Sequence, residues 1–113
     1  MDQTRKDAYA FLLSAALLHV KWDLAGTLGG FPWSNPFHWR HFFRAVDIAG
    51  ARAFLFHNLA IFLARDMQGF REERFWEDVE RFRARYPTDP RPDYRRLFEK
   101  KLNREEVDVM TLG

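Results

Sequence analysis

The apolar positions of this chain recur at helical spacing along most of its length. The first such segment runs from about Thr4 to Leu28, and Gly29-Gly30 is its stop signal. Apolar residues cover most of the circumference, which favours a central helix or one buried by a partner. We expect one face from Tyr9, Leu12, Leu13, Ala16, Val20 and Leu24, extended by Phe11, Ala15 and Leu18.

A second helical pattern follows a loop at Phe31–Asn35 and continues to Gln68. An unbroken helix of that length would span about 50 Å, which is long for a small domain. We therefore expect a break near Asp47–Gly50, because Asp47 can cap a new start and Gly50 lowers helix propensity.

The segment Ala53–Ala64 is apolar except for His57 and Asn58. Its composition predicts the central helix of the fold.

The clearest amphipathic pattern is Arg71–Tyr86, whose apolar residues recur every three or four positions. On its polar side we expect two ion pairs at i,i+4 spacing, Arg74 with Asp78 and Glu77 with Arg81. A turn-rich link at Pro87–Pro92 leads to a short helix, Asp93–Leu102, with Tyr94, Leu97, Phe98 and Leu102 on its apolar face.

These patterns predict one all-α domain, a bundle of four to five helices. Residues 1–103 are expected to form the bundle and residues 104–113 a C-terminal tail. The sequence shows no strand pattern, and 113 residues leave room for a single domain.

The amino-acid composition excludes several kinds of functional site. Cysteine is absent, which excludes disulfides, thiolate zinc sites and cysteine nucleophiles and fits a reducing, cytoplasmic compartment. The apolar stretch Ala8–Val20 is shorter than the roughly 20 residues of a membrane span. Asp2 and Asp7 beside the basic pair Arg5-Lys6 argue against a signal peptide. We expect no membrane partner.

Charge is distributed unevenly. The net charge is +2, yet the middle of the chain is basic, because Pro36–Arg65 contains four arginines, many rings and a single acid, Asp47. Such a mixture indicates that the segment meets something polar: a second chain, a nucleic acid or an internal network.

Rings and basic groups alternate most closely from Phe37 to Arg44. This interleaving suits stacking on bases with charge contacts to phosphate. It equally suits a protein interface, which favours Trp, Phe and Arg as anchors. The candidate residues for contact with a nucleic acid or a protein partner are His38, Trp39, Arg40, His41, Arg44 and Arg52.

Arg52 and His57, followed by Asn58, form the pattern Arg-x-x-x-x-His-Asn. This pattern resembles the signature of the HEPN superfamily, small helical bundles that include many dimeric ribonucleases. The resemblance implies that the Arg and the His converge on an RNA phosphate, often with the partner subunit's pair. The residue after the Arg is often polar in that family, whereas here it is Ala53.

The same residues also have a structural interpretation. His57 and Asn58 would then be hydrogen-bonded core residues, and Arg52 a surface residue or a capping partner. Because its neighbours are almost all apolar, we expect His57 to be buried between Phe54 and Ile61.

A metal site is the remaining candidate from histidine spacing. His38 and His41 stand at i,i+3, but zinc needs three or four ligands and only Asp47 lies nearby. We expect no metal and no cofactor.

The sequence favours a non-catalytic interaction module in a homo-oligomer or a larger assembly, which could contain RNA or DNA. The alternative is a HEPN-like, metal-independent ribonuclease that uses Arg52 and His57. A third class is a binding protein whose helices enclose an apolar ligand.

Overall fold

Four helices surround a core of aromatic and aliphatic side chains. The structure, a computed structural model, describes residues 2–30, 39–89, 91 and 93–107. The helices are α1 (Gln3–Gly30), α2 (Trp39–Ala64), α3 (Glu72–Arg85) and α4 (Tyr94–Leu102). All regular structure within the described ranges is helical, which confirms the all-α fold class. The predicted loop at residues 31–35 lies outside those ranges.

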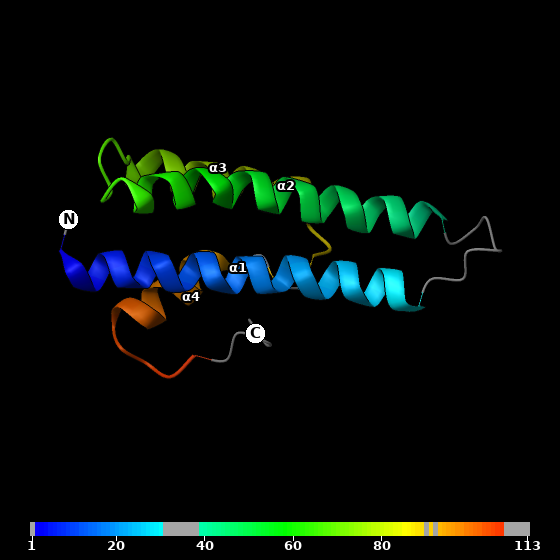
Figure 1. The fold of residues 1–113 in the computed structure, drawn as a ribbon, viewed down its shortest axis with the longest axis horizontal. Coiled ribbons are helices and arrows are strands. Elements are labelled where there is room, and N and C mark those ends of the chain that lie inside the picture. Colours follow the sequence, from blue (N-terminus) through cyan, green and yellow to red (C-terminus); the bar gives the residue numbers. More distant parts are fainter. Residues whose placement is uncertain (1, 31–38, 90, 92, 108–113) are drawn as a thin grey trace.

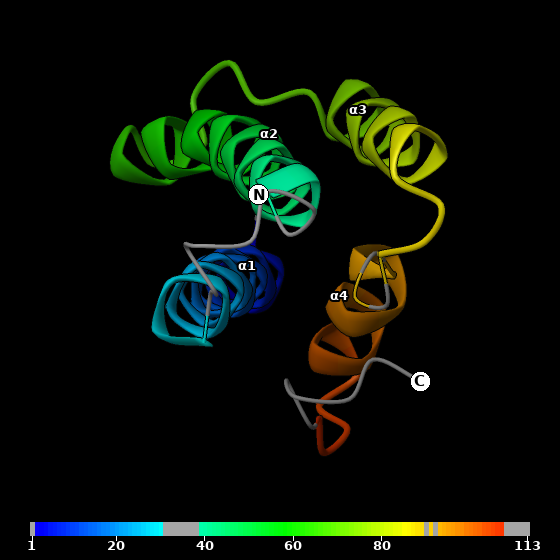
Figure 2. The same ribbon diagram turned by 90° about the vertical axis from the view of Figure 1, so that its right-hand side faces the viewer.

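The two long helices run antiparallel side by side, and the two short ones complete the bundle (Figures 1 and 2). α4 packs on α1, and α3 packs sparsely on α2. The long helices project beyond the short ones at the end where α1 finishes and α2 begins (Figure 1). This overhang makes the molecule 51 Å long but only 28 and 23 Å across.

α1 begins where a side chain replaces the missing helical hydrogen bonds. The carboxylate of Asp2 accepts from the backbone N–H of Arg5 at 2.8 Å, which is an N-cap interaction. Tyr9, Leu12 and Ala16 are buried, as the pattern predicts. Ala15 is buried as well, but the rest of the predicted face is only half-buried, because α2 and α4 cover less than the apolar circumference of α1.

α2 has no break, so the prediction of one near Asp47–Gly50 is wrong. The carboxylate of Asp47 starts no helix: it accepts from the hydroxyl of Tyr86 at 2.8 Å and lies 3.5 Å from Arg85 of α3. A glycine inside a helix costs only about 1 kcal/mol, and packing along α1 outweighs that cost.

Tyr9 occupies the centre of the core. Its ring lies 4.4 Å from that of Phe98 and 5.0 Å from that of Phe70, measured between centroids. Its hydroxyl donates to Glu72 at 2.9 Å and accepts from the indole of Trp76 at 3.2 Å. Burial, together with the hydrogen bond to Glu72, raises the pKa of Tyr9 well above its usual value.

The two short helices follow the sequence pattern closely. α3 buries Phe75, Trp76, Val79 and Phe82, and α4 buries Tyr94, Leu97 and Phe98. Asp93 caps α4 by accepting from the backbone N–H of Arg96 at 3.1 Å. In the predicted tail, Val107 packs against the core.

The turn between α2 and α3 is tightly wound. Asp66, Met67 and Gly69 have φ values of 56°, 63° and 74°, all in the left-handed region. Met67 is buried, and its N–H bonds the carbonyl of Phe62 at 2.6 Å. Only Gly69 adopts such a backbone without a side-chain penalty.

Two glycine substitutions test this description of the backbone. Gly50→Ala should stabilise the protein by about 0.5–1 kcal/mol, because a Cβ there meets nothing within 4 Å and the unfolded chain loses freedom. Gly69→Ala should destabilise it by about 1 kcal/mol because of its positive φ. Urea unfolding followed by circular dichroism measures both, and a destabilising Gly50→Ala would contradict the continuous helix.

Candidate functional site: a buried arginine cluster and the outer face of α2

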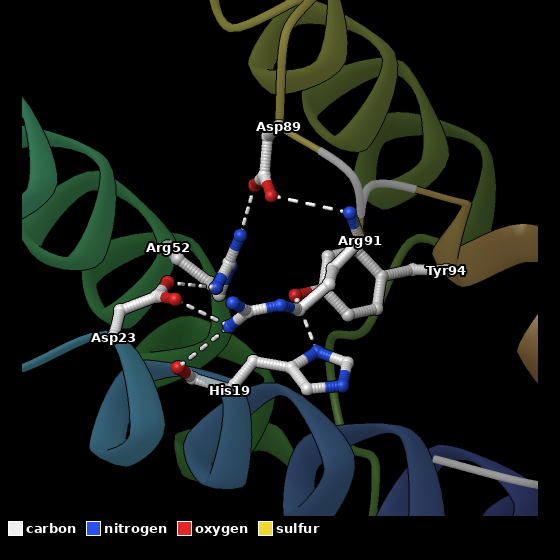
Figure 3. Close-up of polar contacts among 6 residues, drawn as sticks. All are labelled: His19, Asp23, Arg52, Asp89, Arg91 and Tyr94. Carbon is white, nitrogen blue, oxygen red and sulfur yellow. Dashed lines mark hydrogen bonds and ion pairs between the residues drawn. The ribbon is translucent and has the colours of Figure 1, made fainter. Parts of the chain in front are cut away.

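Arg52 lies on the inner side of α2 and is fully buried (0% exposed). Its Nη1 atom forms an ion pair with Asp23 of α1 at 2.9 Å, and its Nη2 atom donates to Asp89 in the link between α3 and α4 (Figure 3). The guanidinium also lies over the rings of Phe82 and Tyr94, 5.6 and 5.9 Å from their centroids. Arg52 thus joins three segments far apart in sequence.

Arg91 completes the cluster from the same link. Its guanidinium pairs with Asp23 and donates to the carbonyl oxygen of His19 at 3.2 Å, while its backbone N–H donates to the carboxylate of Asp89 at 3.1 Å (Figure 3). Two arginines and two aspartates therefore share one site, and their formal charges cancel. Among the described residues, only the Nε atom of Arg52 is a buried side-chain polar atom without a hydrogen-bond partner.

His19 and Tyr94 close the cluster on its core side. His19 is fully buried, and its Nδ1 atom lies 3.3 Å from the hydroxyl of Tyr94. Burial raises the pKa of Tyr94 well above its usual value, so the phenol is neutral at physiological pH.

This geometry corrects the expectation for Arg52. A fully buried guanidinium already paired with two carboxylates is not a surface residue, and it cannot contact a nucleic acid or a partner from this position. Its role in the chain is structural, because a buried cation of this kind is tolerated only when it is paired.

The expectation for His57 is also wrong, since His57 and Asn58 are exposed. Five residues of helix turn the chain by about 140° between side chains, so an inward Arg52 places His57 outward. Phe54, expected to cover His57, is itself 72% exposed. Within a single chain, Arg52 and His57 therefore do not meet in a solvent-reachable cleft. This arrangement does not support the ribonuclease alternative.

The outer side of α2 presents large apolar side chains to solvent. Phe43 is 61% exposed, Val46 40% and Phe54 72%. These three residues, which we call the outer face of α2, recur at helical spacing with Gly50 between them.

The start of α2 also carries the described part of the basic and aromatic cluster. The rings of Trp39, Phe42 and Phe43 lie 5.5–5.9 Å apart between centroids. Arg40 and Arg44 are exposed beside them, and Arg44 also donates to the hydroxyl of Thr88. His38 and the side chain of His41 lie outside the described residues. Within the described part of the chain, no group of three His, Cys, Asp or Glu side chains could hold a metal ion.

α2 also meets a membrane criterion that Ala8–Val20 does not. Phe42–Ala64, 23 residues with a mean hydropathy of 1.4 over its most apolar stretch, is long and apolar enough to cross a membrane by length and composition. Only 28% of that stretch is buried in the fold. The most apolar helix of the protein is therefore also one of its least covered.

Comparison with protein-family models, curated proteins and solved structures finds no match to this chain. The HEPN resemblance consequently stays a hypothesis.

Four members of the cluster around Arg52 were not predicted from the sequence. A signal for the cluster was present, because Arg52 shares the helical register of Phe56 and Leu59, which are both fully buried. A charged residue at a core position requires an opposite charge from another segment. The missed residues are His19, Asp23, Asp89 and Arg91.

Two substitutions test by their effect on stability whether Arg52 is buried and His57 exposed. Arg52→Met should destabilise the protein by about 3–5 kcal/mol, because Asp89 stays buried without this cation. His57→Ala, at an exposed position, should change stability by less than about 0.5 kcal/mol. Chemical denaturation gives both values, and a larger loss for His57→Ala than for Arg52→Met would refute the assignment.

Proposed function

We propose that this chain is a non-catalytic interaction module that associates with a second copy of itself through the outer face of α2. The observation that carries the proposal is the exposure of Phe43 and Phe54 on the most apolar helix. Aromatic side chains are common anchors of protein interfaces. The proposal places the protein in the cytoplasm, in a homo-oligomer or a larger assembly.

The energetic argument rests on the same rings. Fully burying a Phe side chain stabilises an apolar contact by about 1.5–3 kcal/mol relative to leaving it in water. Two copies related by a two-fold axis would each supply Phe43, Val46 and Phe54, so the contribution is doubled. Gly50 between them has nothing within 4 Å of its Cβ position, which leaves room for a close helix approach.

The proposal includes no membrane partner, although α2 is apolar enough to span one. Arg52 lies near the middle of Phe42–Ala64, so a spanning α2 would carry its charge near the centre of the bilayer. In the fold, that charge is neutralised by Asp23 and Asp89. The bundle with its paired charges therefore favours a protein partner for the outer face.

Replacing the exposed rings tests the association. Phe43→Ser with Phe54→Ser should shift the protein from a dimer or larger species to a monomer at micromolar concentration, because the apolar contact is lost. Phe43→Leu with Phe54→Leu keeps apolar area and should retain most of the association. Light scattering after gel filtration measures the molar mass of the species in solution, and a monomeric unmodified protein would contradict the proposal.

A second candidate function is contact with RNA or DNA. It is favoured by Arg40 and Arg44, which are exposed beside the ring cluster of Trp39, Phe42 and Phe43. Rings and arginines in this arrangement suit single strands, whose bases stack and whose phosphates need cations.

The nucleic-acid candidate predicts a salt-dependent shift of RNA or DNA in a gel. Arg40→Glu with Arg44→Glu should abolish the shift, and added salt should weaken it steeply, because each neutralised phosphate releases counterions. Arg96→Glu with Lys100→Glu on α4 makes the same charge change elsewhere and serves as the control. If the unmodified protein retards no nucleic acid at low salt, this candidate is removed.

A further inference from the structure

A groove runs between α2 and α3 on the outer surface of the bundle. Two adjoining hollows of about 310 and 540 Å³ form it, and both are bounded by Leu55, Asn58 and Asp78. Its floor is apolar: Phe62, Phe70 and Phe75 at one end, Phe82 and Tyr86 at the other. α3 has 14 residues, so the groove beside it extends for about 20 Å.

The α3 rim of this groove is basic. Arg71, Arg74, Arg81 and Arg85 border it, spaced so that they share one side of the helix with Asp78. The predicted pair of Arg74 with Asp78 does not form, because Asp78 accepts from Arg81 at 2.6 Å.

Two of these four arginines have no counter-ion among the described residues. Arg85 lies 3.5 Å from Asp47, and Arg81 pairs with Asp78. Arg71 and Arg74 form no ion pair with any described residue and are exposed. The rim therefore offers two free positive charges at the end of the groove where the floor is richest in phenylalanine.

On the α2 side, the middle of the groove is lined by small residues. Gly50 has nothing within 4 Å of a would-be Cβ, and Ala51 beside it is small. A side chain of a ligand therefore meets no bulky side chain of α2 at this point. Asp47 and Asp78 also border the groove, paired with Arg85 and Arg81. The uncompensated positive charge is therefore confined to one end, which suits a short acidic segment better than a continuous phosphate backbone.

From this geometry we propose that the α2–α3 groove binds an amphipathic helix of a partner protein, with its apolar side on the phenylalanine floor and acidic residues against Arg71 and Arg74. Two helices flanking an apolar trough of about 20 Å match a third helix of three to four turns. The charge complementarity sets its orientation, because the free cations are at one end only. The inference goes beyond the proposed function, because it names a second kind of partner for a surface that shares Gly50 and Phe54 with the outer face of α2.

A designed peptide probes the groove directly. A fluorescein-labelled peptide of about 18 residues, with leucine at every third or fourth position and glutamate beside it, is long enough to form a helix. We expect the full chain to bind it, by fluorescence anisotropy, at least about tenfold more tightly than a twin with lysine in place of every glutamate. Failure of the glutamate peptide to bind below about 1 mM overturns the proposal.

Variants locate the binding. Arg71→Glu with Arg74→Glu should weaken binding by at least about tenfold, whereas Arg96→Glu with Lys100→Glu on α4 should leave it unchanged. Gly50→Leu fills the trough without a change of charge and should also weaken binding. Equal losses in the α4 control, or no loss from Gly50→Leu, contradict a site in this groove.

A single-stranded RNA that displaces the peptide from this site would assign the groove to nucleic acid and overturn a protein helix as occupant.

The test is separate from that of self-association. Phe43 borders neither hollow, so Phe43→Ser should weaken the homodimer while leaving peptide binding intact. Loss of self-association with retained peptide binding would contradict the proposed function alone. Loss of peptide binding with a retained dimer would contradict the groove alone.

Discussion

The neutralisation of one buried cation constrains the whole fold. Arg52 occupies a core position of α2, and its charge is compensated by Asp23 from α1 and Asp89 from the link between the short helices. A buried charge is tolerated only with such partners, so α1, α2 and that link must meet at one point. Arg91 balances the second aspartate and ties the link to α1 through the carbonyl of His19. The short helices are thereby positioned by polar contacts as well as by apolar packing.

The same arrangement gives α2 an unusual distribution of side chains. A guanidinium faces inward, while Phe43 and Phe54 face water. The inner side of α2 also buries Leu55, Phe56 and Leu59, so its orientation serves the apolar core and Arg52 together and leaves the two rings exposed. An exposed apolar surface of this kind commonly meets another chain. The ion pairs of Arg52 and the exposure of Phe43 and Phe54 thus depend on the same rotation of α2.

Much of the fold could be predicted from spacing, and the site could not. Apolar residues at three- and four-residue intervals identified α3 and α4 to within a residue at each end. The continuity of α2 through Gly50 was missed, because local propensity is weak against packing along a neighbouring helix. The cluster was missed because its members are 29 and 37 residues apart in sequence. The helical register of Arg52 with Phe56 and Leu59 indicates an inward position, whereas only the fold shows which carboxylates it meets.

The left-handed turn after α2 has a consequence for the neighbouring groove. Three of its four residues from Asp66 to Gly69 have positive φ, and backbone hydrogen bonds join each step to the helix or to the turn itself. The backbone of this turn thus helps to set the spacing of α2 and α3 at that end, together with the packing of Phe62 on Phe70, whose ring centroids lie 5.6 Å apart. A groove that is held at one end by such a turn is partly preorganised, so a ligand that fits it would cost the host less conformational entropy on binding.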